Sequence, residues 1–216
     1  MRSSKVSSAP RQAARVPAAP AAPTGKPKGH ATHEVRIIGG QWRRTRLKVI
    51  DKPGLRPTPD RVRETLFNWL GQDLTGWRCL DAFAGTGVLG FEAASRGAKS
   101  VLMLEQDVQL VGLLGETQKR LAATAVQVQK GDAMMALQRL APGSMDVIFL
   151  DPPYDSAHFE KALKASAQAA VPGGWVYLEA PGAWQPEALA ACGLQPVKYM
   201  KAGAVHAHLL QRPTEG

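Results

Sequence analysis

The stretch Arg78–Glu92, RCLDAFAGTGVLGFE, decides the fold of this chain of 216 residues. A short apolar run ends on Asp81, Gly85 and Gly87 follow, and apolar residues then return at helical spacing. This order predicts a strand, a tight glycine turn and the start of a helix. With Gly90, the two glycines match the spacing G-x-G-x-x-G, which lets the backbone approach a ligand closely and directs amide N–H groups toward it.

The turn alone leaves three interpretations open: a structural turn that needs positive φ, a dinucleotide site, or a site for S-adenosylmethionine. Glu105 closes the next apolar run, 24 residues after Asp81, about where an acid accepts both hydroxyls of a ribose. Both ligands contain that ribose. Asp81 separates them, because a carboxylate just before the glycines repels a pyrophosphate but suits an amino group and a sulfonium charge. We therefore predict S-adenosylmethionine as the cofactor.

Composition indicates one domain of ordinary size with a basic extension. Hydrophobic residues make up 44% of the chain, enough for a sizeable core. The net charge is +9, but residues 1–33 contain six Lys or Arg and no acid, which leaves about +3 for the remainder. Prolines interrupt every apolar run in 1–33, so we predict a disordered basic tail there rather than a secretory signal or a transit peptide. The mild charge of the rest is compatible with a nucleic-acid partner without requiring one.

Cysteine spacing and hydropathy exclude other classes of protein. Cys79 and Cys192 form no C-x-x-C pair, so neither a disulfide framework nor a zinc site is implied. We expect no metal and a reducing, cytoplasmic location. No apolar run approaches the roughly 20 residues of a membrane span, so we expect no membrane association.

Ordered structure is predicted from Glu34 onward. We expect a β-hairpin over 34–51, followed by a catalytic core over 58–212. The second hairpin strand, expected over 42–50, alternates Arg44, Arg46 and Lys48 with less polar residues, so that one face is cationic. Two interpretations remain: a solvated edge strand whose charges discourage pairing, or a hairpin that grips phosphates.

A helix is predicted after the hairpin, ending near Leu70. Thr58 should supply its N-cap and Pro59 its first helical position, with Asp60 as an acid in the first turn. Helical spacing predicts a buried stripe formed by Val62, Leu66, Trp69 and Leu70.

Further apolar runs alternate with helical stretches, one of them at 107–121. The runs lie at 101–104, 126–128, 145–150, 174–178, 195–200 and 204–211. This alternation predicts a mostly parallel sheet with helices on both faces and an antiparallel hairpin at the C-terminal end. Such sheets bind ligands at the carboxyl ends of their strands, where four acids fall: Asp81, Glu105, Asp132 and Asp151.

A second motif, Asp151-Pro152-Pro153-Tyr154, follows the run at 145–150. Two prolines hold the backbone extended and lack N–H groups, which leaves nearby carbonyls free to accept hydrogen bonds. With the Asp151 carboxylate, they would orient an exocyclic amino group and favour the charge that develops on nitrogen as it attacks a methyl group. Tyr154 can stack on a flat base. A rigid strand-exit turn is the alternative, but the glycine turn 70 residues earlier favours a site for an amino group.

Together, the glycine turn and the Asp-Pro-Pro-Tyr motif resemble those of the S-adenosylmethionine-dependent amino methyltransferases. Two further stretches, RIIGGQW at 36–42 and RPTPDRVRETLFN at 56–68, resemble one branch, the RsmD family. The likeness covers roughly residues 34–212, and the four motifs occur in the family's order.

The resemblance implies an α/β fold: a seven-stranded, Rossmann-like class I methyltransferase sheet with an N-terminal β-hairpin extension, forming one methyltransferase domain over 34–212. It implies methylation of the N2 amino group of guanine 966 in bacterial 16S rRNA, with the rRNA inside a small ribosomal subunit particle and the enzyme as a monomer. Methyl transfer would involve Asp151, Pro152, Pro153 and Tyr154. The cofactor would be held by Asp81, Phe83, Gly85, Thr86, Gly87, Glu105, Asp132, Ala133 and Thr58. The candidate RNA-binding residues are Arg36, Arg43, Arg44, Arg46 and Lys48.

Two other functions stay open from the residues alone. An adenine-N6 DNA methyltransferase is one, because the Asp-Pro-Pro-Tyr motif recognises an amino group and not a particular purine. A basic RNA-binding assembly factor without catalytic turnover is the other.

Overall fold

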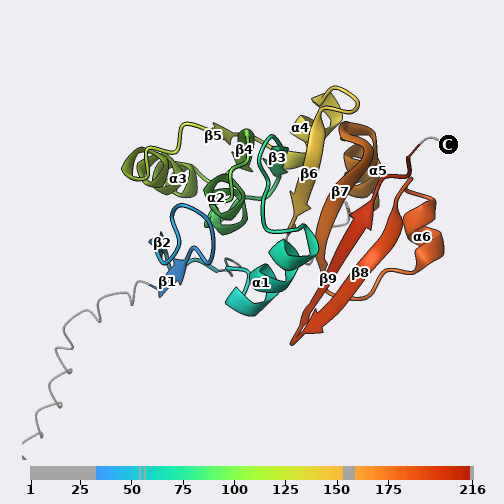
Figure 1. Ribbon diagram of the computed structural model, residues 1–216, viewed down its shortest axis with the longest axis horizontal. Helices are drawn as coiled ribbons and strands as arrows, with labels where there is room; N and C mark the ends of the chain where they lie inside the picture. The colour runs from blue at the N-terminus through green and yellow to red at the C-terminus, as the bar shows by residue number, and fades with distance from the viewer. Residues whose placement is uncertain (1–32, 54, 56, 153–158, 215–216) are drawn as a thin grey trace, which may run out of the picture. The chain divides into compact units, whose positions relative to one another are not determined.

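The computed structural model describes residues 33–53, 55, 57–152 and 159–214 (Figure 1). In this part of the chain, one sheet is built from seven strands: β3 (Arg78–Asp81), β4 (Ser100–Glu105), β5 (Val126–Lys130), β6 (Met145–Leu150), β7 (Ala170–Ala180), β8 (Gln195–Ala202) and β9 (Val205–Gln211). Their order is β5-β4-β3-β6-β7-β9-β8. The strands from β5 to β7 are parallel, whereas β9 runs antiparallel to both β7 and β8. The predicted sheet and its C-terminal hairpin are confirmed.

Helices cover both faces of this sheet (Figure 1). One hydrophobic core lies under α1 (Asp60–Trp69), α2 (Val88–Ser95) and α3 (Val108–Arg120). A second core lies under α4 (Ala133–Arg139), α5 (Phe159–Ala169) and α6 (Pro186–Ala190). The helix expected at 107–121 is therefore present as α3, and Asp107 caps it by accepting hydrogen bonds from two backbone N–H groups. None of the helices in the described residues is long and apolar enough to span a bilayer.

The alternation of side chains along each strand decides which acids face which layer. On β3, Cys79 belongs to the core under α1–α3 and Leu80 to the core under α4–α6, so that Asp81 faces α1–α3. On β7, Tyr177 belongs to the first core, and Glu179 follows it by two residues on the same face. Asp81 and Glu179, at the ends of the two strands that flank β6, thus share one side of the sheet.

The N-terminal hairpin is shorter than predicted. Its antiparallel strands are β1 (His33–Arg36) and β2 (Arg46–Val49), so the predicted hairpin is confirmed, but its second strand is shorter than the expected 42–50. Arg44 lies in the turn between them with a left-handed φ of 69°. Only Arg46 and Lys48 alternate with buried residues, Leu47 and Val49, on β2.

The turn is long because it docks on α2. The Ser95 hydroxyl donates to the carbonyl oxygen of Gly39 and accepts from the backbone N–H of Trp42. Gly40 has a φ of 72°, and a Cβ there would lie 1.8 Å from the carbonyl oxygen of Ser95. Only glycine fits so close to the helix. The contact with α2 holds these residues in the turn, so that they do not belong to the strand. The alternation of side chains along the sequence does not indicate this contact.

The start of α1 also differs from the prediction. Pro59, not Thr58, occupies the N-cap position, and no side chain caps the helix. The Thr58 hydroxyl instead donates to Glu179 at 2.8 Å, a buried contact that outweighs local capping. Along the helix, most of the predicted stripe is buried, Trp69 is only partly so, and the wholly buried Arg63 and Phe67 were not predicted.

Candidate active site

The glycine turn joins β3 to α2 at the carboxyl edge of the sheet. Gly85 and Gly87 have φ of 51° and 74°, as a turn of this kind requires. A Cβ on Gly87 would lie 2.3 Å from the Leu114 side chain, and one on Gly90 would lie 2.5 Å from Met103. Close packing therefore explains Gly87 and Gly90 without a ligand. Gly85 meets one side chain only, at 3.1 Å, and is the glycine that remains open to a close approach.

Glu105 at the end of β4 is held beside this turn. Its Oε2 accepts from the backbone N–H of Gly85 at 2.9 Å, and its Oε1 accepts from that of Asp107 at 2.9 Å. The carboxylate is only partly buried, and each oxygen keeps a second lone pair. This geometry suits the predicted contact with the two hydroxyls of a ribose.

The remaining candidate cofactor residues lie at the same edge. Asp132 follows β5, and its Oδ1 caps α4 by accepting from the backbone N–H of Met135 at 2.8 Å, while the side chain stays exposed. Ala133 is the buried first residue of α4, Phe83 packs partly buried on the core under α4–α6, and Thr86 lies in the glycine turn. Because β5, β4 and β3 are neighbours, the fold brings these positions together with Glu105.

Asp81 lies deeper than expected for a direct ligand contact. Its side chain is 2% exposed, and Oδ2 accepts from the backbone N–H of Gly90 at 3.0 Å. Burial raises the pKa of Asp81 to about 7, the Gly90 hydrogen bond partly offsets this, and the negative charges of Glu105 and Glu179 raise the pKa further. The contact of Asp81 with a cofactor remains a prediction.

Two more carboxylates lie beside Asp81. Burial raises the pKa of Asp151, which follows β6, well above its ordinary value, and the charges of Glu179 and Asp81 add to this effect. Burial also raises the pKa of Glu179 at the end of β7, while hydrogen bonds from the Thr58 and Tyr177 hydroxyls lower it. We call Asp81, Asp151 and Glu179 the carboxylate cluster.

Sequence reasoning missed Glu179, although a signal for it was present. Glu179 directly follows the apolar run at 174–178, as Asp151 follows the run at 145–150. The rule that selected Asp151 would have selected Glu179 as well. Of the Asp-Pro-Pro-Tyr motif, Pro152 is buried, whereas Pro153 and Tyr154 lie outside the described residues.

The carboxylate cluster has no cationic partner among the described residues. Among the described residues, no Lys, Arg or His side chain forms an ion pair with any of its three members. The described residues also contain no group of three or more His, Cys, Asp or Glu side chains with the geometry to hold a metal ion. An organic cation is the kind of ligand that would relieve the repulsion, and the sulfonium and ammonium charges of S-adenosylmethionine fit this requirement.

A buried arginine links the hairpin to this region. The Arg63 guanidinium donates to the carbonyl oxygens of Thr58 and Arg36 at 3.0 and 2.9 Å, and to Asp60 Oδ1 at 2.6 Å. It also approaches Glu92 at 3.4 Å. Burial lowers the pKa of Arg63, and the charges of Glu92 and Asp60 oppose that shift. Because the Thr58 hydroxyl in turn donates to Glu179, Arg63 is linked to the carboxylate cluster through Thr58.

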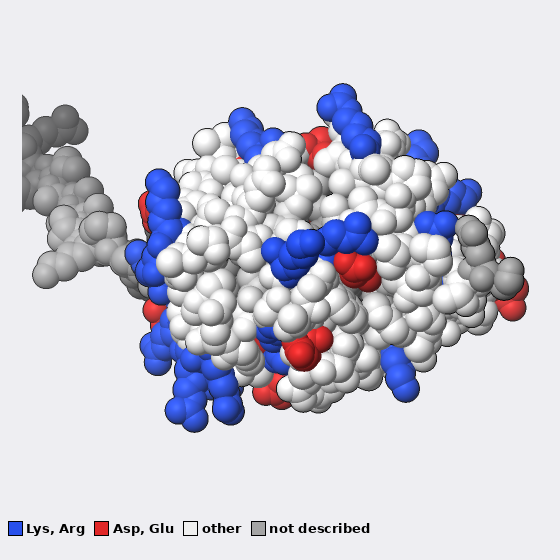
Figure 2. Space-filling view, turned by 45° about the horizontal axis from the view of Figure 1, so that its top comes forward, with Lys and Arg blue, Asp and Glu red and all other residues white. Residues whose placement is uncertain are grey.

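The predicted RNA-binding cations divide into two groups. Arg36 pairs with Asp60 and Arg46 with Glu34, each at 2.8 Å. The other three, Arg43, Arg44 and Lys48, are exposed and form no ion pair within the described part of the chain. Figure 2 shows Lys and Arg side chains gathered at its left edge, on the side where β1, β2 and α3 lie in Figure 1.

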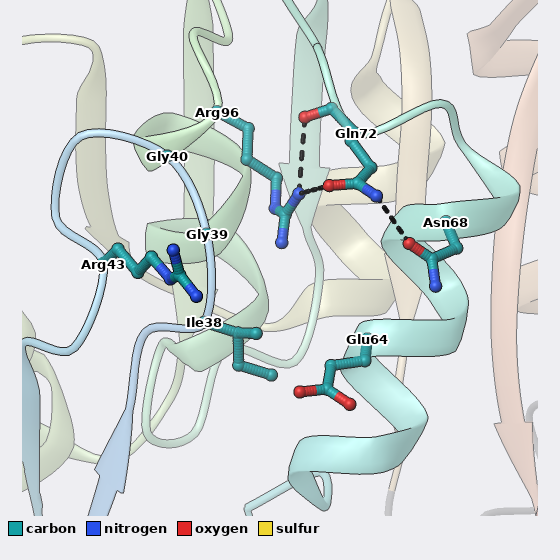
Figure 3. A pocket seen from close by; sticks show the side chains of 8 residues that line it. All are labelled: Ile38, Gly39, Gly40, Arg43, Glu64, Asn68, Gln72 and Arg96. Carbon is teal, nitrogen blue, oxygen red and sulfur yellow. Dashed lines mark hydrogen bonds between the residues drawn. The ribbon is translucent and has the colours of Figure 1, made fainter.

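A hollow of about 470 Å³ separates the hairpin turn from α1 (Figure 3). Arg43 approaches it from the turn, and Glu64 and Asn68 line it from α1. On its inner side, Gln72 donates to Asn68 at 2.7 Å and accepts from Arg96 through its side-chain oxygen at 3.5 Å. No member of the carboxylate cluster lines this hollow, so it is distinct from the candidate active site.

A sheet with this strand order, a glycine turn after its central strand and an acid at the end of the next strand is the class I methyltransferase fold. The model of one family, described as conserved hypothetical protein 95, matches residues 35–211. The chain belongs to this family, the RsmD family that its motifs indicated.

Named relatives and solved structures agree with this assignment. A relative from Escherichia coli, named ribosomal RNA small subunit methyltransferase D, is 43% identical over 139 residues, which cover 64% of this chain and 69% of the relative. A solved structure of a putative methyltransferase from Escherichia coli is 33% identical with a TM-score of 0.73, over 85% of this chain and 100% of that chain. An S-adenosylmethionine-dependent methyltransferase from Aquifex aeolicus shares the fold, with 17% identity and a TM-score of 0.52 over 71% and 93% of the two chains.

Proposed function

We propose that this protein transfers a methyl group from S-adenosylmethionine to the N2 amino group of a guanine in small-subunit rRNA, the guanine numbered 966 in 16S rRNA. The observation that carries the proposal is the carboxylate cluster at the ends of β3, β6 and β7, which has no basic partner among the described residues. The name of the Escherichia coli relative supports rRNA of the small subunit as the substrate.

The cofactor would lie across the ends of β3, β4 and β5. Glu105 would accept from the ribose hydroxyls, the free carboxylate oxygen of Asp132 would accept from the adenine amino group, and Gly85 would allow close approach. The cofactor would supply a methyl group bound to a positively charged sulfur. Asp81, buried beneath the turn, would favour that charge through its field.

Asp151 would act on the substrate. Its carboxylate accepts no hydrogen bond from the described residues and is free to accept from the exocyclic amino group, with Pro152 holding the strand exit rigid. Orienting the amino group aligns its nitrogen with the methyl carbon and the sulfur, which is the main requirement for this transfer. The nitrogen then carries a surplus proton. The raised pKa of Asp151 makes it a suitable acceptor for that proton.

The hairpin would hold the RNA backbone while the target base leaves its stack. Arg43, Arg44 and Lys48 have no acidic partner among the described residues, so phosphate contacts would not require an existing ion pair to break. Flipping the base costs a few kcal/mol and is easiest in a loop. We expect the enzyme to work as a monomer, in the cytoplasm, on rRNA within a small-subunit particle.

Mass spectrometry of rRNA from a strain that lacks the gene tests this function. We expect one guanine of 16S rRNA to lose its N2 methyl group, and the wild-type gene but not Asp151→Ala to restore it. Loss of N6-methyladenine from DNA instead would favour an adenine methyltransferase. Restoration of growth by Asp151→Ala without the methyl group would indicate a non-catalytic assembly factor.

A further inference from the structure

Asp151 and Glu179 occupy equivalent places on neighbouring strands. The parallel ladder of β6 and β7 pairs Leu150 with Leu178, so the next residue on each strand, Asp151 and Glu179, falls in the same row. Neighbouring strands lie about 4.8 Å apart, and side chains in one row of one face are adjacent. Both acids follow the aromatic pair Phe149 and Tyr177 by two residues and therefore share its face of the sheet.

Among the described residues, only one of the two carboxylate oxygens of Glu179 accepts hydrogen bonds. Its Oε1 accepts from the hydroxyls of Thr58 and Tyr177 at 2.8 and 2.9 Å. Two donors on one oxygen fix the orientation of a side chain that is 3% exposed. Its Oε2 accepts no hydrogen bond from the described residues, so this oxygen can accept a donor from outside them. A donor supplied by a ligand would satisfy it.

We propose that Glu179 determines the base specificity of this enzyme by accepting, through Oε2, the N1–H of the target guanine while Asp151 accepts from the N2 amino group. The proposal rests on the proposed function and deepens it. Guanine presents two adjacent donors on this edge, N1–H and the N2 amino group, which matches two adjacent carboxylates.

The same pair of carboxylates would reject adenine. Adenine carries a lone pair on N1, and that lone pair would face the Glu179 carboxylate without an intervening hydrogen. A site built to receive a donor discriminates strongly against a base that lacks it, because its own buried group is left unpaired.

The substitution Glu179→Gln separates base recognition from folding. The amide oxygen can still accept from Thr58 and Tyr177, while the NH₂ group replaces Oε2 and donates where the carboxylate accepted. The probes are two versions of the same rRNA substrate, carrying either guanine or 2-aminopurine at the target position. 2-Aminopurine keeps the 2-amino group but has a lone pair instead of a hydrogen on N1. Differences in the reactivity of the two amino groups cancel when the variant is compared with the wild type.

We expect the wild type to methylate guanine faster than 2-aminopurine in single-turnover assays, and Glu179→Gln to lower that preference by about 10- to 100-fold, the range for a hydrogen bond to a charged group. Glu116→Gln, an exposed acid on α3, is the matched control and should keep the wild-type preference. Thr58→Val should slow both bases alike, because it removes a donor to Oε1 and not the contact with N1.

Three results would overturn the inference. One is an equal loss of rate on both bases in Glu179→Gln, which would make Glu179 purely structural. Another is a preference in Glu179→Gln that stays within twofold of the wild type. A third needs no variant: equal rates of the wild type on guanine and 2-aminopurine. Failure of the proposed function looks different, since the wild type would then leave the guanine of rRNA unmethylated.

Discussion

Glu92 on α2 is the acid whose removal should cost the fold most. It is wholly buried, and its two oxygens accept from the backbone N–H groups of Ile38 and Gly39, each at 2.8 Å. They also accept from Arg96 at 2.8 and 3.0 Å and from Arg63 at 3.4 Å. One carboxylate thus joins the hairpin, α1 and α2.

Glu92→Gln keeps the shape of the side chain but removes its charge. Two buried guanidinium groups lose a counter-charge, and the new NH₂ group faces donors on either side. Breaking a buried ion pair by removing one partner costs about 3–5 kcal/mol. Arg63 retains Asp60 at 2.6 Å, so we expect the lower end, about 3 kcal/mol. At about 2–4 °C per kcal/mol for a protein of this size, Tm should fall by roughly 6–12 °C.

Urea unfolding followed by circular dichroism, together with calorimetry for Tm, measures this change. The control is Glu160→Gln, which breaks an exposed ion pair with Lys164 and should change the stability little, because solvent screens exposed charges. High salt should reduce the small effect in the control and leave the effect of Glu92→Gln almost unchanged. A Glu92→Gln protein within 1 kcal/mol of the wild type would refute the view that this buried network holds the hairpin in place.

Three further predictions concern the cofactor, pH and RNA. Glu105→Ala should weaken S-adenosylmethionine binding by roughly 1.5–3 kcal/mol, and unchanged affinity in calorimetry would remove Glu105 from the site. The pKa of Asp81 is raised from 3.8 to about 7 in the folded protein, so its contribution to the free energy of unfolding is full below about pH 4 and is lost as pH rises to about 7, with a slope of at most about 1.4 kcal/mol per pH unit. Because Asp151 and Glu179 contribute slopes of the same sign, the stability of Asp81→Asn without cofactor should fall less steeply with pH than that of the wild type, and an equal slope would contradict this prediction. Neutralising Arg43, Arg44 and Lys48 should reduce the slope of the logarithm of the RNA-binding constant against the logarithm of the salt concentration by about 0.7–0.9 per lost phosphate contact. Identical slopes would instead support the interpretation of the hairpin as a solvated edge strand.

The sequence alone was sufficient for the sheet, most of its helices and the edge that carries the site. Strand and helix periods are local signals, and the glycine turn after Asp81 marks a strand-to-helix junction without any knowledge of the rest of the chain. Glu105 and Asp151 could be placed because each directly follows an apolar run, and the carboxyl ends of parallel strands meet at one edge.

Only the tertiary structure decided the contacts that cross between elements. Nothing within ten residues of Thr58 indicates that its hydroxyl leaves the helix start for Glu179, a residue 121 positions away. The burial of Arg63 depends equally on carbonyl and carboxylate groups from the hairpin and α2. The hairpin turn was extended by packing on Ser95, which local strand alternation does not report. A buried polar group takes whichever partner the folded chain brings within reach, because leaving it unpaired costs more than a lost helix cap or a shortened strand. For this reason the periodic elements could be predicted from the sequence. That Glu179 and Asp151 lie in one row of the sheet could be known only from the register of β6 and β7.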